Sequence, residues 1–324
     1  MRKLIVLLSA IAFVVAYTVP AIADGGSFYG HARMSTFMDS KSKEKSCTGF
    51  DDDDLTWVIQ LNARVAATAK AGAVGGRFEL GRDYTPVTTL YGDQIWGDDL
   101  GLLDWGMPYA GRQDQVAMQM GGLQVALLRP STPEVAAFNI AKTTDIDTIM
   151  PKIEVSYDFT AGPVGVGVFG GMNNYDEVDA TDQDTSIDSN VMGILANVAF
   201  GRCLCKAGTY FGTNLGTYGF AGGGKPTYTT KLNDSYDMGY FLVAGFKASD
   251  TLSVQAGYGY SEREVDVAGS KTDDGAAYYV QAKIDFAKNI WVIPEIGKFD
   301  YKDNAAGLDE GDLTYFSAKW EIRF

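Results

Sequence analysis

Residues 57–70 read Trp57-Val-Ile-Gln-Leu-Asn-Ala-Arg-Val-Ala-Ala-Thr-Ala-Lys70, and apolar and polar side chains alternate along most of this stretch. One parity carries the apolar residues Trp57, Ile59, Leu61, Ala63, Val65 and Ala67. The opposite parity carries the polar residues Gln60, Asn62, Arg64, Thr68 and Lys70. A period of two is typical of a β-strand, because successive side chains point to opposite faces. The stretch therefore predicts a strand with one apolar face and one hydrogen-bonding face.

The same period recurs from Ser27 onward and predicts an all-β chain of about fourteen antiparallel strands, with sixteen as the alternative. Strands of about ten residues suit a tilted crossing of a bilayer. Short links alternate with long polar ones, as in membrane barrels. The expected strands are 27–37, 55–69, 72–83, 112–120, 122–129, 151–160, 164–175, 190–200, 207–219, 236–248, 251–262, 275–286, 290–301 and 312–324.

The N-terminal residues predict export. Arg2 and Lys3 precede an apolar run that ends in Ala21-Ile22-Ala23, the pattern of a signal peptide with its cleavage site. We therefore expect a cleaved signal peptide over 1–23 and a single transmembrane β-barrel domain over 24–324. Downstream of residue 23 no stretch approaches the roughly 20 apolar residues that a spanning helix requires. A closed barrel is the remaining way to satisfy every backbone group in hydrocarbon, so we expect the outer membrane of a Gram-negative bacterium.

Charge and reactive side chains exclude several classes of function. A formal net charge of −14 excludes a nucleic-acid binder. The single histidine, His31, and the absence of a Gly-x-Ser-x-Gly sequence argue against an enzyme, and no metal or cofactor is expected. Cys203 and Cys205 flank Leu204, far from Cys47, which allows either a local disulfide or no structural role.

The C-terminal segment 313–324 alternates again. Its apolar parity carries Phe316, Ala318, Trp320, Ile322 and Phe324. This resembles the terminal strand of bacterial outer-membrane proteins, which ends in Phe and is recognised by the barrel-assembly machinery. The resemblance implies that machinery, the bilayer and its lipopolysaccharide as partners. Aromatic residues near strand ends are expected to form interfacial girdles: Tyr258, Tyr260, Tyr278, Trp291, Tyr315, Phe316 and Trp320.

A second segment carries a more specific resemblance. Gly81-Arg82-Asp-Tyr-Thr85-Pro86 looks like the Gly-Arg-x-x-Thr-Pro stretch that leads into the inward-folded constriction loop of Gram-negative general porins. A homotrimeric porin family of sulfate- and metal-reducing bacteria is also similar to this sequence over Trp57–Asn62, Gly75–Leu80 and Leu90-Tyr91-Gly92. The resemblance implies that 84–111 folds into the lumen and that the chain forms a homotrimer. One departure is the strand count, since three strands precede this loop here and five do so in the common sixteen-strand porins.

These observations predict a water-filled diffusion channel whose constriction is built from opposite charges. Expected pore residues on the loop are Asp93, Asp98, Asp99 and Asp104. Expected residues on the wall or at the loop's base are Arg33, Arg64, Arg77, Glu79, Arg82, Arg112 and Lys152. Such charges bias ion selectivity. A second role for the basic residues is to pair with carboxylates and hold the loop. The alternative function is a structural or adhesive barrel whose acidic loops bind a partner or divalent cations.

Overall fold

The computed structural model describes residues 26–41, 55–71, 76–89, 101–133, 135, 145–148, 150–178 and 184–322. For the strands between residues 26 and 82 it describes the backbone alone, without side chains. The predicted signal peptide, residues 1–23, and the terminal Phe324 lie outside the described residues. No helix within these ranges is long and apolar enough to cross a membrane.

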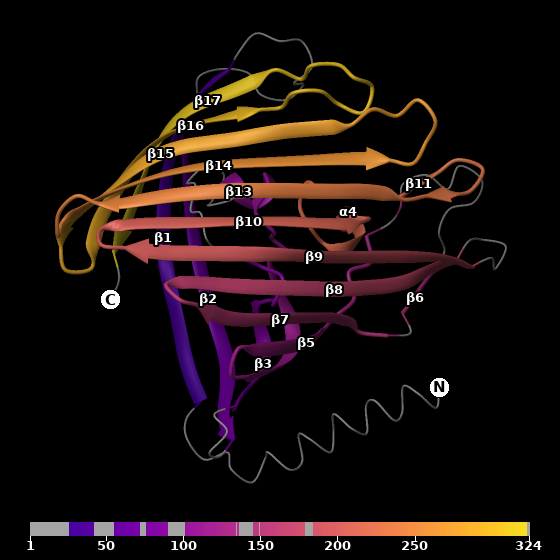
Figure 1. Ribbon diagram of the computed structural model, residues 1–324, viewed down its shortest axis with the longest axis horizontal. Helices are drawn as coiled ribbons and strands as arrows, with labels where there is room; N and C mark the ends of the chain where they lie inside the picture. The colour runs from indigo at the N-terminus through magenta and orange to yellow at the C-terminus, as the bar shows by residue number, and fades with distance from the viewer. Residues whose placement is uncertain are drawn as a thin grey trace.

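Fourteen strands pair in a closed antiparallel ring, which confirms the predicted barrel and its strand number (Figure 1). Each strand pairs with the next one around the ring, and β1 pairs with β17 to close it. The ring consists of β1 (Gly26–Lys41), β2 (Leu55–Ala71), β3 (Gly76–Tyr84), β4 (Arg112–Met120), β5 (Leu123–Leu128), β7 (Lys152–Ala161), β8 (Val164–Val178), β9 (Asp184–Phe200), β10 (Cys203–Thr213), β13 (Ser235–Lys247), β14 (Leu252–Val265), β15 (Asp273–Ala287), β16 (Ile290–Asp300) and β17 (Asp312–Ile322).

Three shorter strands lie outside the ring. β6 (Asp145–Asp147) pairs with the far end of β8, beyond the part of β8 that pairs with β7. β11 (Thr227–Tyr228) and β12 (Leu232–Asn233) form a separate two-stranded hairpin in the connection from β10 to β13. These additions lie at the end of the barrel that carries the long connections, opposite the short turns (Figure 1).

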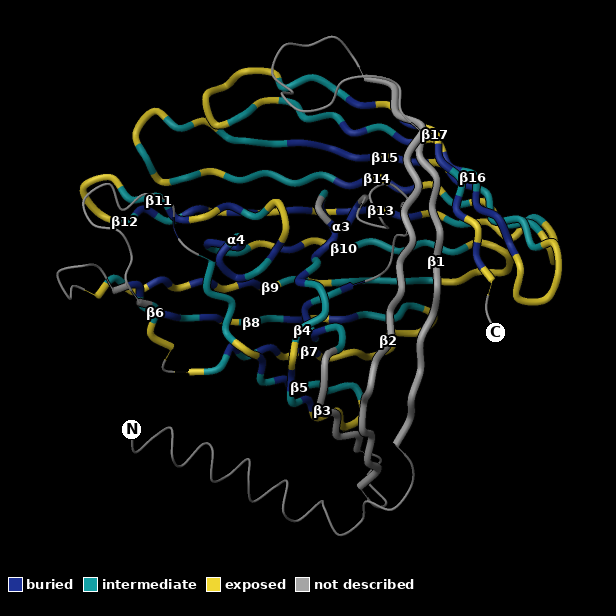
Figure 2. The backbone as a smooth tube through the Cα atoms, turned by 180° about the vertical axis from the view of Figure 1, so that it is seen from behind, coloured by how far each residue is buried: buried dark blue, intermediate teal, exposed yellow. Residues whose placement is uncertain are grey.

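The barrel places its apolar side chains outside and many of its polar side chains inside. On β17, Phe316 is 58% exposed and Trp320 is 49% exposed, whereas Ser317 and Lys319 are buried. The same alternation of buried and exposed positions runs along β13 and β9 (Figure 2). A soluble protein would bury the apolar parity, so this inversion matches a barrel in lipid.

The outward apolar surface forms a belt. On β13 it extends from Tyr236 to Phe246, ten residues apart and both exposed. A rise of about 3.4 Å per residue and a tilt of about 40° make this span about 25 Å tall, the height of the apolar band of outer-membrane barrels. Other exposed aromatic side chains in the belt are Tyr157, Phe159, Phe200, Phe211, Tyr240, Tyr258, Tyr278 and Phe286.

Two of the expected girdle residues point inward instead. Trp291 is 7% exposed and Tyr315 is 2% exposed, on the inward parity of β16 and β17. Tyr315 stacks on Phe299 and donates a hydrogen bond to Glu295 at 2.7 Å. An aromatic residue near a strand end can serve either face, so only its parity decides between girdle and interior.

The expected strand 207–219 is also wrong at its C-terminal end. β10 ends at Thr213, and Leu215–Tyr218 forms the single helical turn α4. Asn214 precedes this turn in the left-handed conformation, with φ 56°. That conformation breaks a strand, and Asn tolerates it better than most residues do. Cys203 and Cys205, at the start of β10, are free thiols.

Candidate pore constriction

The described parts of the connection from β3 to β4, residues 85–89 and 101–111, fold into the barrel, as predicted for 84–111. Its short helix α3 (Gly101–Asp104) and the residues after it pack on the inner faces of β13, β15, β16 and β17. Leu102 and Met107 are buried there against wall residues. Those wall residues are Phe241, Val243, Ala277, Tyr279, Phe299, Leu313 and Tyr315. The inner wall is therefore apolar where the loop rests on it.

The inner wall has glycine residues at the two positions where this loop packs most closely against it. A Cβ atom at Gly259 would overlap the carbonyl oxygen of Trp105, and one at Gly275 would overlap the Trp105 ring. Glycine at both positions lets the backbone of the loop lie directly on β14 and β15. The loop is thus fitted to one side of the lumen.

A second connection folds inward from the neighbouring side of the ring. Between β10 and β13, α4 and the residues after it pack on the inner faces of β8, β9 and β10. Leu215 and Tyr218 are fully enclosed, and Phe220 is 6% exposed and meets Tyr210 edge-on at 5.4 Å. Val87 and Ala110, near the two ends of the first loop, belong to the same apolar cluster. The two inward loops therefore contact each other inside the barrel.

Glu154 on β7 ties both loops to the wall. The Tyr218 hydroxyl donates a hydrogen bond to Glu154 Oε1 at 2.9 Å, and the Val87 backbone N–H donates one to Oε2 at 3.0 Å. Lys152, two residues earlier on β7, lies 3.1 Å from Oε1 and also donates to the Tyr218 carbonyl at 3.0 Å. Its ammonium group lies 3.8 Å from the centre of the Tyr218 ring. One carboxylate thus receives a bond from each loop.

The Tyr218 hydroxyl is held in its protonated, donating form. Burial, and after it the negative charge of Glu154 and their hydrogen bond, raise the pKa of Tyr218 well above its ordinary value. A Cβ atom at Gly171 on β8 would collide with this hydroxyl, so glycine leaves the space that Tyr218 occupies. The packing and the hydrogen bond therefore fix the ring in one position.

The predicted site residues fall into three groups. Asp93, Asp98 and Asp99 lie outside the described residues. For Arg33, Arg64, Arg77, Glu79, Arg82 and Asp104 the backbone is described and the side chain is not. The described members are Arg112, which lies over the Tyr84 ring at 4.3 Å at the loop's base, and Lys152. Lys152 is fully enclosed and pairs with Glu154, which matches the loop-holding role considered for the basic residues.

The second inward loop was missed by sequence reasoning. Its residues 215–224 continue the alternating pattern of β10 for a few positions and then contain three consecutive glycines, Gly222 to Gly224. The glycine run was the available signal, because it disfavours a strand. Nothing in the sequence pattern showed that this segment turns into the lumen.

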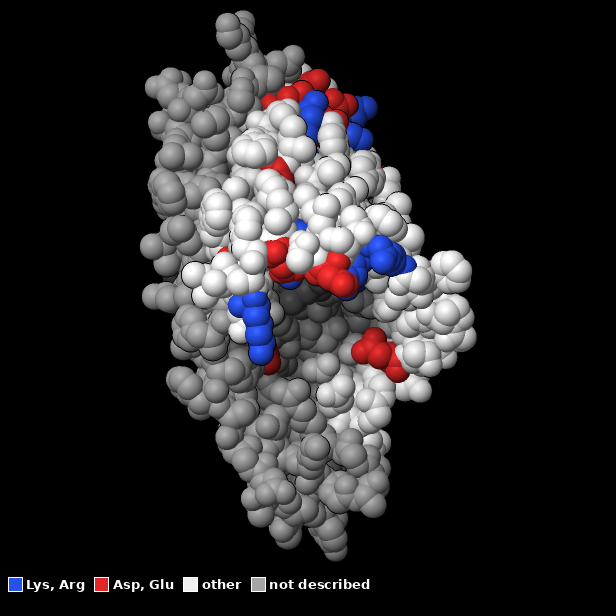
Figure 3. Space-filling model, turned by 90° about the vertical axis from the view of Figure 1, so that its left-hand side faces the viewer, with Lys and Arg blue, Asp and Glu red and all other residues white. Residues whose placement is uncertain are grey.

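One end of the barrel is hollowed. Figure 3 views the end with the short turns, where the opening is bordered by both basic and acidic side chains.

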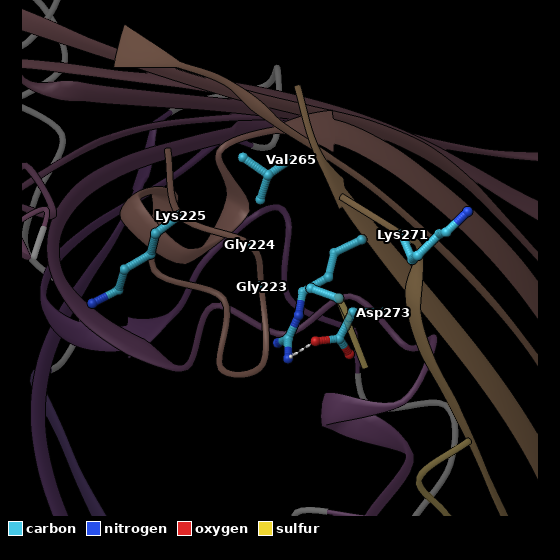
Figure 4. A pocket seen from close by; sticks show the side chains of 8 residues that line it. Gly223, Gly224, Lys225, Val265, Lys271 and Asp273 are labelled. Carbon is cyan, nitrogen blue, oxygen red and sulfur yellow. Dashed lines mark hydrogen bonds and ion pairs between the residues drawn. The ribbon is translucent and has the colours of Figure 1, made fainter. Parts of the chain in front are cut away.

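At the opposite end, a pocket lies between the return limb of the second loop, at Gly223 to Lys225, and the facing ends of β14 and β15. In Figure 4 the side chains of Lys225 and Lys271 point in opposite directions, and Asp273 pairs with Arg263 at 2.7 Å. The two lysines therefore do not converge on one ligand.

Comparison with known proteins places this architecture. No family model and no curated protein matches the chain. Among solved structures, the outer membrane channel DcaP of Acinetobacter baumannii matches with a TM-score of 0.67 and 12% sequence identity. That match covers 92% of this chain and 97% of DcaP. The chain has the fold of the outer-membrane porins.

Other structures with the porin fold match over similar lengths. OmpT of Vibrio cholerae has a TM-score of 0.55 at 15% identity, covering 93% of this chain and 99% of its own. An anion-selective porin from Comamonas acidovorans has a TM-score of 0.54 at 13% identity, with the same coverage of 93% and 99%. At such low identities the porin fold is what these proteins share with this chain.

Proposed function

We propose that this chain forms a water-filled outer-membrane channel for passive diffusion of small hydrophilic solutes and ions. The observation that carries the proposal is the inward packing of the β3–β4 loop inside a closed ring of fourteen strands. A ring of eight strands is filled by its own side chains, whereas a larger one leaves a lumen. A loop that narrows such a lumen without sealing it makes a selective pore.

Charge supports the choice of hydrophilic solutes. The first loop carries Asp93, Asp98, Asp99 and Asp104, and the described bodies of both inward loops rest on the β7–β17 side of the ring. The strands across from that side, β1 to β4, carry Arg33, Arg64 and Arg77 together with Glu79. The β1–β17 register pairs Arg33 with Glu321, whose side chain is buried on the inward parity. We propose that these groups face the acidic loop across the pore and bias ion selectivity.

Assembly is part of the proposal. An exposed apolar belt supports the proposal that the barrel lies in the bilayer of a Gram-negative outer membrane, in contact with its lipid and lipopolysaccharide. Export through a cleaved signal peptide over 1–23 and insertion by the barrel-assembly machinery, through the strand that ends in Phe324, would bring it there. We propose a homotrimer, in line with a neighbouring structure described as the trimer form of OmpT.

Two measurements test the channel. Liposomes containing the purified protein should swell in isotonic solutions of small sugars, and an impermeable protein would instead favour the structural or adhesive alternative. In planar bilayers, an Arg64→Ala, Arg77→Ala variant should shift the reversal potential towards cation preference, because it removes positive charge from the wall. Unchanged conductance and ion preference in this variant would show that these arginines do not line the pore.

A further inference from the structure

The second inward loop, residues 214–224, has no role in the function described so far. It lies inside the ring, it is fixed by buried contacts, and it touches the first loop. Its sequence between Leu215 and Gly224 contains no charged residue, in contrast to the acidic first loop. The tip at Ala221 and Gly222 is exposed, whereas Tyr218 and Phe220 behind it are buried. The loop thus presents a small, neutral surface and keeps its aromatic residues against the wall.

We propose that residues 214–224 form the second wall of the constriction and set its size limit without setting its ion preference. The proposal rests on the proposed channel function. Glu154 supplies the coupling, since one oxygen holds Tyr218 of the second loop and the other holds Val87 of the first. The two loops are thereby held at a fixed distance from each other. The first loop supplies charge, and the second supplies a neutral steric limit.

Fixation of the second loop is built from several independent contacts. Asp237 on β13 accepts hydrogen bonds from the backbone N–H of Gly224 at 2.6 Å and of Leu215 at 3.4 Å. The side-chain amide of Asn214 donates to the Asp188 carbonyl at 2.8 Å, and its oxygen accepts from the Ser235 N–H at 2.8 Å. A loop held at both ends and at Tyr218 is a fixed part of the lumen, as a size limit requires.

The geometry of the loop allows it to be removed cleanly. The Gly216 N–H donates to the Gly224 carbonyl at 2.8 Å, so the two limbs lie side by side where the loop begins. Deleting residues 217–222 and joining Gly216 to Gly223 requires no stretch of the chain. A matched control deletes residues 304–308, joining Asp303 to Asp309, which already face each other as an isolated β-bridge in an exposed outer loop.

The test measures single-channel conductance, sugar permeation and reversal potential for both deletions, in protein whose barrel is folded by circular dichroism. The 217–222 deletion should raise conductance roughly two-fold and admit larger sugars. The reversal potential should stay unchanged, because the charged groups that Tyr218 and Gly222 contact remain paired, Lys152 with Glu154 and Arg263 with Asp273. The 304–308 deletion should leave all three unchanged. Wild-type conductance and size limit in a folded 217–222 deletion would overturn the second wall while leaving the channel intact. An absence of conduction in the wild type as well would overturn the channel and this proposal together.

A second variant keeps the proposal testable if the deletion does not fold. Ala221→Trp adds bulk at the exposed tip and leaves the buried contacts of Tyr218 and Phe220 in place. It should lower conductance and exclude sugars that the wild type passes. Ala306→Trp, in the exposed outer loop, is the matched control and should change neither. Equal permeation by Ala221→Trp and the wild type would place the tip outside the pore and overturn the proposal.

Discussion

Lys152 and Glu154 form an ion pair of 3.1 Å whose two side chains are both fully enclosed, at the point where the two inward loops meet the wall. Removing one partner of a buried pair leaves the other charge uncompensated, which costs about 3–5 kcal/mol. We therefore expect Glu154→Gln to lower the thermal stability of the barrel and to make the open-channel current noisier. The second effect follows because both loops lose their charged acceptor.

The matched control for this substitution is Asp250→Asn. Asp250 pairs with Lys247 at 2.9 Å, but the side chains are 98% and 57% exposed. Exposed pairs contribute little to stability, so this variant should melt like the wild type. Equal melting of the Glu154→Gln variant would show that the buried pair does not hold the loops.

Tyr218→Phe removes one hydrogen bond from Glu154 and keeps the ring. A typical intramolecular hydrogen bond contributes about 1 kcal/mol, and one to a charged group about 1.5–3 kcal/mol. We expect a loss of stability in that range, smaller than for Glu154→Gln, measured by urea unfolding of detergent-solubilised protein. A loss as large as that of Glu154→Gln would mean that the ring itself shifts in the variant.

Alkaline pH should act on the same hydroxyl. The pKa of Tyr218 is raised in the folded state by burial, so the stability that its protonated form contributes is fully present below its unfolded value, about 10. This stability is lost as the pH rises above that value. Unfolding free energy should therefore fall more steeply above pH about 10 in the wild type than in Tyr218→Phe. If unfolding free energy fell equally with pH in the two proteins, the protonated Tyr218 hydroxyl would not contribute to stability.

Gly259→Ala should displace the first loop. The added Cβ atom would overlap the Trp105 carbonyl, which is backbone and cannot rotate away. Overpacking of this kind costs about 1–3 kcal/mol, and a displaced loop should also change conductance. Gly245→Ala is the control, because its Cβ atom would meet Leu204 at 3.6 Å, an ordinary contact. Retained conductance and stability in Gly259→Ala would show that the loop is not seated on β14.

The apolar belt predicts that an added charge destabilises the barrel within the belt but is tolerated in an outer loop. Ile296 is 54% exposed and lies between Val280 and Phe316 on the neighbouring strands, which are also exposed. Arginine on the lipid face at mid-bilayer costs about 2–4 kcal/mol. Ile296→Arg should fold poorly into vesicles, whereas Leu308→Arg, in an outer loop, should fold normally. Normal folding of both variants would show that the belt does not contact lipid.

The barrel was predictable because its dominant signal is local. The alternation of apolar and polar residues along β2 and β17 can be recognised in each strand by itself. Applying the same period-two pattern to the rest of the sequence predicts fourteen strands. Trp291 and Tyr315 were wrongly predicted to face the membrane because the prediction used only this local pattern. An aromatic residue satisfies either face, and the inner wall under α3 is apolar, so β13 carries apolar residues on both faces over Phe241 to Val243.

The constriction was predictable only in part. The first loop was found because 84–111 is too long and irregular for a simple turn. The second loop is short and begins with residues that extend the β10 pattern. Its inward path depends on Asp237, Glu154 and Gly171, which lie on three other strands. Such long-range contacts leave no periodic trace in the sequence.

The pairing of β1 with β17 has a consequence for biogenesis. The register that joins Arg33 to Glu321 brings together the first and last strands of the ring, so this seam forms only after β17 has been made. Until then both outermost strands have unpaired backbone groups, which are a template for aggregation. A chain truncated anywhere before β17 would lack a partner for β1 and should aggregate, so a truncation that removes β17 alone should be as damaging as one that removes half of the ring.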